Sequence, residues 1–564
     1  MGKNILVTEI ESYTGGDFMV NGQSSKKSPF KLYRTVPINY IQKPMQLKRV
    51  KKMLQKLFHS SFDLVFRPVG DQFLVAYLYP VIDMDRMERT VLTPLKEHMQ
   101  EKESLIQSQN KNQKEQTSTA LEAPHINNET QKNQLTNIGY FDQVFTSGVI
   151  VYQKKWKNIC SEMIKGSVVV FQQQGAEAAV LRLPNFEHRA ITEPDSEKQV
   201  RGPREGFIED IGVNMSLLRK KMRSPSLVFE QQTIGNLTET RVVLAYAKGI
   251  CDPEILQELR DRLSMINIQG VLESGYLEAF IVDHPWTPFP QTENTEKPDK
   301  AIAEIMEGRI AILVDGSPNV ILVPVVYGQF MQASEDYYEN FWYGSALRIL
   351  RALTFFIALF LPGIYVAITS MHQEMLPTSF ALKLAGAREG VPFPAIAEAF
   401  FMEIAFEFLR EAGIRLPAQI GQAVSIVGAL IIGQAAVEAG IVSPVLVVVV
   451  ALSGIASFVI PSYRLAIAFR LIRFAILLSS GILGLIGITF VALLFLIHLS
   501  SMHSFGVPYF EPVAPFKKSH LQDWFYRANW QTKAKKPFNI AINKMRNKVT
   551  SETVPFSKKG NYPH

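Results

Sequence analysis

Residues 393–417 read FPAIAEAFFMEIAFEFLREAGIRLP, followed by GQAAVEAG at 433–440 and PSY at 461–463. Carboxylates, arginines and glutamines stand here within sequence that is otherwise apolar enough for a bilayer. Ionisable side chains are costly in such surroundings, so they usually face a partner, a water-filled cavity or the membrane surface. Charged sequence of a soluble type precedes the stretch, whereas its flanks are apolar. The stretch therefore predicts that the chain combines a soluble part with a membrane part.

A helix is predicted over residues 394–413, and its charges follow the helical repeat. Glu403 and Glu407 are four residues apart and share a face, and Glu407 precedes Arg410 by three residues and Glu411 by four. The opposite face is apolar, with Phe400, Phe401, Ile404 and Phe408. Two interpretations stay open: the helix lies on the membrane surface with a solvated charged face, or it lines a polar cavity within an assembly.

Residues 420–460 are long enough for two membrane spans joined by a tight turn at 438–444. Small residues recur in the first half, which suits close packing of helices in a membrane. Gln434 and Glu438 are the polar residues near the turn. We therefore predict that a pore or polar cavity is lined by Glu403, Glu407, Gln434 and Glu438.

The overall composition averages two different kinds of sequence. The chain has 564 residues, of which 47% are hydrophobic and 20% charged, but residues 346–505 are overwhelmingly apolar. A net charge of +7 is modest for this length, so no nucleic-acid partner is expected. The two cysteines, Cys160 and Cys251, lie far apart, which excludes a disulfide scaffold and a cysteine-rich zinc site.

The soluble part is predicted to be α+β and to contain two subdomains. Alternating apolar runs bounded by glycine-containing turns predict antiparallel strand pairs. These pairs are 62–67 with 72–78, 167–172 with 178–183, and the two halves of 309–324, and further strands are predicted at 227–231 and 239–247. The fold class is thus an α+β soluble N-terminal region of two subdomains, followed by an α-helical transmembrane domain.

The domain boundaries follow the changes in composition. Residues 101–138 are almost wholly polar and cannot bury enough apolar area to offset the entropy of ordering, so we expect a disordered insertion. No secretory signal is recognised at the N-terminus, which places the soluble part inside the cell. The expected division is a flexible arm (1–45), subdomain 1 (46–190), subdomain 2 (191–335), a helical membrane domain (345–505) and a basic cytoplasmic tail (506–564).

The soluble part lacks the signatures of an enzyme. We find no phosphate-binding loop, GxGxxG, HExxH or GxSxG motif, and His188 and His284 have no evident nucleophile or metal partner. No catalytic residue, cofactor or metal site is therefore expected. Ion pairs that hold the linker between the subdomains are predicted among Glu193, Glu197, Arg201 and Arg204.

Membrane spans are predicted at 349–369, twice within 420–460, and at 474–500. The basic tail is placed in the cytoplasm by the positive-inside rule, and its tryptophans suggest contact with anionic lipid or a partner. With both ends inside, an even number of crossings is needed. We favour four, with the 394–413 helix not crossing. This topology places Arg464, Arg470 and Arg473 on the outer side.

A series of short motifs recurs in order along the chain. They are EP at 193–194, SE at 196–197, RGP at 201–203, FIED at 207–210, PFPQ at 288–291, residues 308–324, PFP at 392–394, residues 410–417, GQAAVEAG at 433–440, and Pro461 with Tyr463. In these motifs the chain resembles the A subunits of the GerA family of spore germination receptors. It departs from that pattern in the insertion at 101–138 and in Lys297, where the family usually has arginine.

The resemblance implies a membrane protein of the dormant bacterial spore, in the inner membrane. Its partners would be a transporter-like B subunit, a lipoprotein C subunit and further copies of the A subunit. Such complexes sense nutrients and trigger ion release, and their A subunits are thought to oligomerise around a pore. An auxiliary membrane protein of sporulation or germination is the alternative within the family. A secondary transporter would need inverted repeats, and the sequence shows none.

Overall fold

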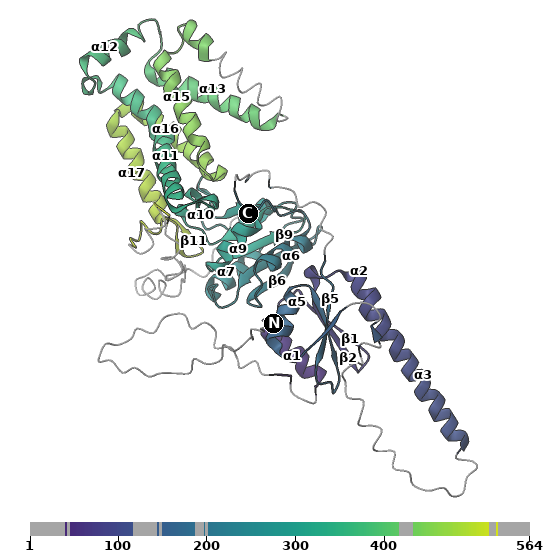
Figure 1. The fold of residues 1–564 in the computed structure, drawn as a ribbon. Coiled ribbons are helices and arrows are strands. Elements are labelled where there is room, and N and C mark those ends of the chain that lie inside the picture. The colour runs from purple at the N-terminus through teal and green to yellow at the C-terminus, as the bar shows by residue number, and fades with distance from the viewer. Residues whose placement is uncertain are drawn as a thin grey trace, which may run out of the picture.

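The computed structural model describes residues 40–41, 45–116, 141, 144–145, 149–185, 194, 197, 201–416, 433–517 and 526–527. Two sheet-containing units follow each other along the chain, and a bundle of helices extends from the second unit (Figure 1). The predicted fold class, two α+β subdomains followed by a helical region, is confirmed. The predicted flexible arm lies almost wholly outside the described residues, as do most of the basic tail and residues 417–432. The first of the two spans predicted within 420–460 falls largely on the latter residues and stays a prediction.

Subdomain 1 is an antiparallel sheet with helices on both faces. The strands pair in the order β1-β2-β4-β5-β3. They are β1 (Leu64–Val69), β2 (Phe73–Leu78), β3 (Ile150–Gln153), β4 (Ser167–Gln172) and β5 (Ala178–Arg182). One face packs against α1 (Leu47–Leu57) and α5 (Trp156–Ile164), and the other against the segment from η1 to the start of α3. That segment comprises η1 (Tyr79–Val81), α2 (Met84–Met87), η2 (Glu88–Leu92) and α3 (Thr93–Gln116).

Subdomain 2 repeats this three-layer arrangement. Its sheet has the order β6-β7-β9-β10-β8, again antiparallel. The strands are β6 (Leu227–Ile234), β7 (Thr240–Ala247), β8 (Glu293–Thr295), β9 (Ile310–Val314) and β10 (Val320–Val323). Helices α7 (Pro253–Ser264) and α8 (Ser274–Ile281) cover one face, and α6 (Ile211–Lys221) and α9 (Pro298–Met306) cover the other. The three predicted strand pairs are confirmed, and the two strands predicted at 227–231 and 239–247 pair with each other as β6 and β7.

The helical region begins where subdomain 2 ends, after η3 (Tyr327–Met331) and α10 (Glu335–Tyr338). Its helices are α11 (Phe341–Ser370), α12 (Thr378–Gly386), α13 (Ala395–Arg415), α15 (Pro444–Phe458), α16 (Tyr463–Leu483) and α17 (Leu485–Ser501), with a short turn η4 (Gln373–Met375). Within the described residues, α11 and α16 are long and apolar enough to cross a membrane, and α15 and α17 are shorter apolar helices.

The predicted last span at 474–500 is wrong. This apolar run is divided at Gly484, whose φ of 61° ends α16 and lets the chain reverse into α17. A side chain at position 484 would meet the ring of His372, just beyond the end of α11. The other ends of both helices lie at subdomain 2, where Arg464 pairs with Glu278 and His498 Nε2 lies 2.8 Å from Thr287 Oγ1. Thus α16 and α17 form an antiparallel hairpin, and Arg464 lies on the side of the soluble subdomains.

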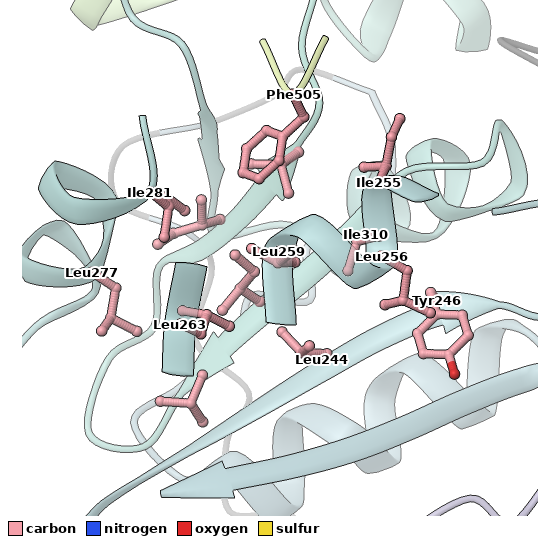
Figure 2. Close-up of a cluster of buried hydrophobic side chains, with 14 of the residues drawn as sticks. Leu244, Tyr246, Ile255, Leu256, Leu259, Leu263, Leu277, Ile281, Ile310 and Phe505 are labelled. Carbon is pink, nitrogen blue, oxygen red and sulfur yellow. The ribbon is translucent and has the colours of Figure 1, made fainter. Parts of the chain in front are cut away.

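After α17 the chain returns into the core of subdomain 2. Strands β11 (His503–Ser504) and β12 (Val507–Pro508) form a small hairpin with Phe505 at its tip. Phe505 is buried with residues of α7 and α8, as Figure 2 shows, and Arg262 covers its ring. Its backbone N–H donates to Asp283 Oδ2 at 2.7 Å. The end of the last apolar helix is therefore attached directly to a soluble core.

Residues 101–116 correct the predicted insertion. They are helical and continue α3 to Gln116, because the segment is rich in glutamine, lysine and glutamate, which favour helix even without an apolar face. Residues 117–138 lie outside the described residues. The prediction of disorder for that remainder stays a prediction.

Candidate functional site: a buried carboxylate–arginine cluster

Helix α13 carries the two predicted glutamates into the interior of the helical region. Glu403 and Glu407 are one turn apart and both face α15 and α16. The side chain of Glu403 is 0% exposed, and that of Glu407 is 22% exposed. In the single chain Glu403 is enclosed by its own helices, and the interpretation that the helix lines a polar cavity within an assembly stays a prediction.

Helix α16 supplies two of the opposing charges. Arg473 Nη2 lies 3.1 Å from Glu403 Oε2 and 3.2 Å from Glu407 Oε1, so it contacts both carboxylates. Arg470, three residues earlier, donates from Nη1 to Glu407 Oε2 at 3.0 Å. Arg470 and Arg473 are three residues apart on α16, and Glu403 and Glu407 are four apart on α13. Both spacings place two side chains on the same face of a helix, so the arginines and the carboxylates meet where the two helices pack.

Helix α15 completes the cluster with hydroxyl groups. Ser453 Oγ donates to Glu403 Oε1 at 3.4 Å and accepts from Arg473 Nη1 at the same distance. Ser457 Oγ accepts from Nη2 of Arg410 at 3.0 Å. Arg410 also pairs with Glu407 at 3.1 Å. We call these seven residues the helical cluster: Glu403, Glu407, Arg410, Ser453, Ser457, Arg470 and Arg473.

Close helix approach encloses the helical cluster in apolar surroundings. The ring of Phe406 on α13 lies over Gly454 of α15, where a Cβ atom would come within 2.4 Å of the ring. The Arg410 guanidinium stacks 4.8 Å from the Phe406 ring and 5.0 Å from that of Phe458. Glycine at position 454 is required for this contact, since any side chain would displace the phenylalanine.

Charge in the helical cluster is unbalanced. Three guanidinium groups face two carboxylates, which leaves one formal positive charge in excess. Among the described residues, Nε of Arg410 and Nε of Arg473 are buried without a hydrogen-bond acceptor. Buried ion pairs cost desolvation that their attraction only partly offsets, so apolar residues of the same size would hold such helices together as well.

The other two predicted cavity residues lie apart from the helical cluster. Gln434 Nε2 donates to Glu438 Oε1 at 2.8 Å, and both side chains are exposed. Their prediction as pore-lining residues is not tested by the single chain. The sequence analysis missed Arg470, Arg473, Ser453 and Ser457. The sequence does carry a signal for the arginines: Arg470 and Arg473, like Glu403 and Glu407, have helical spacing within an apolar segment, and opposite charges in two such segments indicate a contact.

A family model described as Bacillus/Clostridium GerA spore germination protein matches residues 52–539. The chain belongs to the GerA family. The match spans both soluble subdomains, the helical cluster and the chain beyond α17. The predicted resemblance is thereby confirmed.

Relatives of this GerA-family chain are found in Bacillus. Spore germination protein KA of Bacillus subtilis is 42% identical over 78% of this chain and 80% of its own length. The uncharacterized membrane protein YfkQ of the same species is 44% identical over 69% and 76%. Spore germination protein A1 is 41% identical over 68% and 80%. The family has a role in spore germination and is not a known class of enzyme.

Among solved structures, the chain is similar to the N-terminal domain of the A subunit of the Bacillus megaterium spore germinant receptor GerK3. The identity is 24%, the TM-score 0.35, and the match covers 51% of this chain and 98% of the other.

The linker residues of the GerA-family chain have partners outside the linker. Glu197 pairs with Lys300 at 2.9 Å and accepts from Thr295 Oγ1 at 2.6 Å, which ties the linker to β8 and α9. Burial raises the pKa of Glu197, but Lys300 and the hydrogen bonds outweigh this and hold it below its usual value. Arg201 pairs with Glu339 at 3.3 Å. Glu193 lies outside the described residues, and the pairing predicted for Arg204 stays a prediction.

The described residues contain no group of three or more His, Cys, Asp or Glu side chains that could hold a metal ion. Both cysteines are buried, and burial raises the pKa of Cys160 and of Cys251 to about 12. Such thiols stay protonated and are poor nucleophiles. Among the described residues we therefore take the helical cluster, with its ionised side chains inside an apolar helical region, as the candidate functional site.

Proposed function

We propose that this GerA-family chain is the A subunit of a nutrient germinant receptor, which couples nutrient sensing to ion release across the spore inner membrane. Family membership over residues 52–539 supports the receptor role. The apolar helices α11 and α16 support a membrane location. The observation that carries the coupling role is the helical cluster, a buried charge network at the contact of α13, α15 and α16.

Four crossings are proposed, by α11, α15, α16 and α17. The start of α11 is held at subdomain 2 by Asp336, which accepts from Arg351 Nη1 at 2.6 Å. At its other end Tyr365 lies 3.2 Å from Ser443, which precedes α15. The α16–α17 hairpin begins and ends at subdomain 2. Successive helices thus run in opposite directions. Both the soluble subdomains and the tail then lie on one side, which we assign to the cytoplasm, as basic residues in the tail favour.

In this proposal the helical cluster is an element with alternative pairings. Arg473 contacts both carboxylates, and Glu407 contacts three arginines. A displacement of α13 along α16 by about one turn, about 5.4 Å, that brings Glu403 to the present place of Glu407 would pair Glu403 with Arg470, while Glu407 keeps Arg410 of its own helix. Such discrete states are what a sensor needs to pass a signal to an ion path.

Assembly with other chains completes the proposed receptor. A homo-oligomer would enclose the ion path, and Gln434 and Glu438, which are exposed in the single chain, would line it, whereas Glu403 and Glu407 would reach it only after a shift of the helices that enclose Glu403. The B subunit, a transporter-like membrane protein, and the lipoprotein C subunit are the proposed partners. Lipid is the proposed contact of the tail. Nutrient recognition is then placed mainly on the B subunit.

The test is a double change, Glu403→Gln with Glu407→Gln, in spores that contain the complete receptor. We expect altered nutrient-triggered ion release at a normal protein level in the membrane fraction, because the arginines lose their charged partners while shape is kept. The matched control is Glu411→Gln on the same helix, whose carboxylate pairs with Arg415 on the exposed surface. Unchanged ion release by the double variant would contradict the coupling role.

Reconstitution in sealed liposomes separates this function from the alternatives. The chain is incorporated alone or with the B and C subunits, and ion flux is recorded with and without nutrient. Nutrient-dependent flux that needs all subunits fits a receptor with an ion path. Flux coupled to a solute gradient would indicate a transporter component, and no flux under any condition an auxiliary membrane protein.

A further inference from the structure

Helix α8 presents an outward face without charge. Leu277 and Ile281 point into the core of subdomain 2, as Figure 2 shows. The two acidic residues of this segment are engaged: Glu278 is buried and pairs with Arg464, and Glu273 caps the helix N-terminus. What remains exposed is apolar or aromatic, namely Leu272, Tyr276, Ala279 and Phe280. A surface helix of a soluble protein normally carries charged residues on this face.

The loop after α8 presents a tryptophan in the same way. Trp286 is 97% exposed, although its backbone is held firmly. The side chain of Gln291 accepts from the N–H groups of Asp283 at 3.0 Å and His284 at 2.9 Å, and donates to the His284 carbonyl at 2.6 Å. Exposed apolar residues in isolation are common, but this loop follows the charge-free helix face within five residues of the chain, and we refer to the two together as the patch.

This patch adjoins the ends of the apolar helices. Thr287, the neighbour of Trp286, contacts His498 in the last turn of α17. Phe289 is buried between helices, with ring centroids 6.3 Å from Phe469 on α16 and 5.6 Å from Phe495 on α17. Exposed apolar side chains of α17 continue from this point, among them Leu494 and Ile497. The loop therefore lies level with the end of the surface that would face lipid.

We propose that the outward face of α8 and the Trp286 loop rest in the headgroup layer of the bilayer. Tryptophan and tyrosine favour this layer because an apolar ring and a polar tip suit its two environments. An apolar helix face at the same level suits an interfacial helix. The partner is thus a lipid surface, and subdomain 2 has a fixed orientation against it. This inference rests on the proposed membrane location.

The experiment uses the full chain in vesicles and reads the fluorescence of Trp286. Trp156 is kept as a constant background because it lies in the core of subdomain 1. The remaining tryptophans, Trp342, Trp524 and Trp530, become phenylalanine. Vesicles contain lipid brominated either close to the glycerol backbone or close to the chain end. The Trp286 signal is the difference from the same chain with Trp286→Phe.

We expect blue-shifted Trp286 emission, with greater loss in lipid brominated near the headgroup than in lipid brominated near the chain end. Two controls lack Trp286. Phe490→Trp, on the exposed face of α17, should lose more emission in the deep brominated lipid. Val149→Trp, exposed on subdomain 1, should lose none.

Each other outcome overturns the assignment in a different way. If Trp286 emits as in water while Phe490→Trp is quenched, the chain spans the membrane but the patch does not touch it. Blue-shifted Trp286 emission that bromine does not quench would mean that another protein surface, such as a second copy, covers the patch. If neither tryptophan is quenched, the proposed membrane location itself fails, and this inference fails with it.

Discussion

Asp63 and Arg219 form a buried pair at the joint between the two soluble subdomains, whereas the helical cluster buries two carboxylates with three arginines. At the joint both side chains are 0% exposed, and Arg219 binds Asp63 through Nε at 2.8 Å and Nη2 at 2.9 Å. Nη1 donates to the Ser224 carbonyl, and Ser61 Oγ donates to Asp63 Oδ1 at 2.6 Å. Every guanidinium nitrogen therefore has an acceptor, and the charges balance.

The helical cluster has neither property. One positive charge is in excess, and two Nε atoms lack an acceptor among the described residues. A fully satisfied buried network favours one arrangement strongly, because any movement leaves a charge without its partner. A network with surplus donors loses less on rearrangement. We infer that the Asp63–Arg219 pair is suited to hold the two subdomains rigidly, whereas the helical cluster is suited to change its arrangement.

Removal of Asp63 tests the rigid member of this comparison. Asp63→Ala should lower the free energy of unfolding of the soluble part by about 3–5 kcal/mol, because Arg219 is left buried without its counter-charge. Denaturant unfolding in detergent of the full chain, with its other four tryptophans changed to phenylalanine and followed by Trp156 fluorescence, measures the loss. The double change Asp63→Ala with Arg219→Met should cost less than the two single losses together.

An exposed pair serves as the control for the joint. Arg241 bonds Asp315 through two nitrogens, at 3.0 and 2.8 Å, but its side chain is 53% exposed. Arg241→Ala should cost below about 1 kcal/mol, as exposed pairs do. Equal losses at the joint and at this pair would contradict the importance of burial.

Local sequence signals predicted the sheets and failed at the long-range contacts. The strand pairs follow from alternating apolar residues around a turn, for example at Gly70, and need only short-range information. The Asp63–Arg219 pair joins residues 156 positions apart, and Arg219 stands beside Lys220 and Lys221 as if on a solvated face. The chain reversal at Gly484 was missed because the run from 474 to 497 contains several glycines and no charged residue that would mark one of them as a turn.

The two carboxylates of the candidate site were predicted, and the arginines of α16 that pair with them were not. The helical spacing of Glu403 and Glu407 in an apolar segment marked them as unusual, because ionised carboxylates need partners there. Their partners come from α15 and α16, and no spacing rule on α13 names residues on other helices. Only the fold brings Arg470 and Arg473 to these carboxylates.

Substitution of two arginines of the helical cluster, Arg473 and Arg470, should lower the free energy of unfolding by different amounts. Arg473→Gln leaves Glu403 buried without its ion pair and should cost about 3–5 kcal/mol. Arg470→Gln removes the surplus charge while Glu407 keeps Arg410 and Arg473, so the loss should be about 1–3 kcal/mol. Thermal unfolding of the full chain in detergent ranks the variants. A greater loss for Arg470→Gln would reverse the roles assigned here.

A small effect that depends on pH is expected at Glu230 in subdomain 2, which forms a partly exposed ion pair. Arg260 donates to Glu230 Oε2 from Nε at 2.9 Å and to Oε1 from Nη2 at 2.6 Å, and Tyr246 donates its hydroxyl. Burial raises the pKa of Glu230, but these hydrogen bonds outweigh burial and hold the pKa below its ordinary value of 4.5. Glu230→Gln should cost about 1 kcal/mol at neutral pH.

The sign of the pH dependence follows from the lowered pKa. A carboxylate with a folded-state pKa below its unfolded value stabilises fully above the unfolded value, here 4.5, and loses that contribution as pH falls through the folded-state pKa. The difference in unfolding free energy between the parent chain and Glu230→Gln should therefore shrink below pH 4.5. Asp63→Ala removes an ion pair that is 0% exposed, whereas Glu230→Gln removes one that is partly exposed. The losses of unfolding free energy in the two variants therefore compare a buried with a solvent-accessible ion pair. A Glu230→Gln difference that is constant with pH would show that packing, rather than ionisation, stabilises this site.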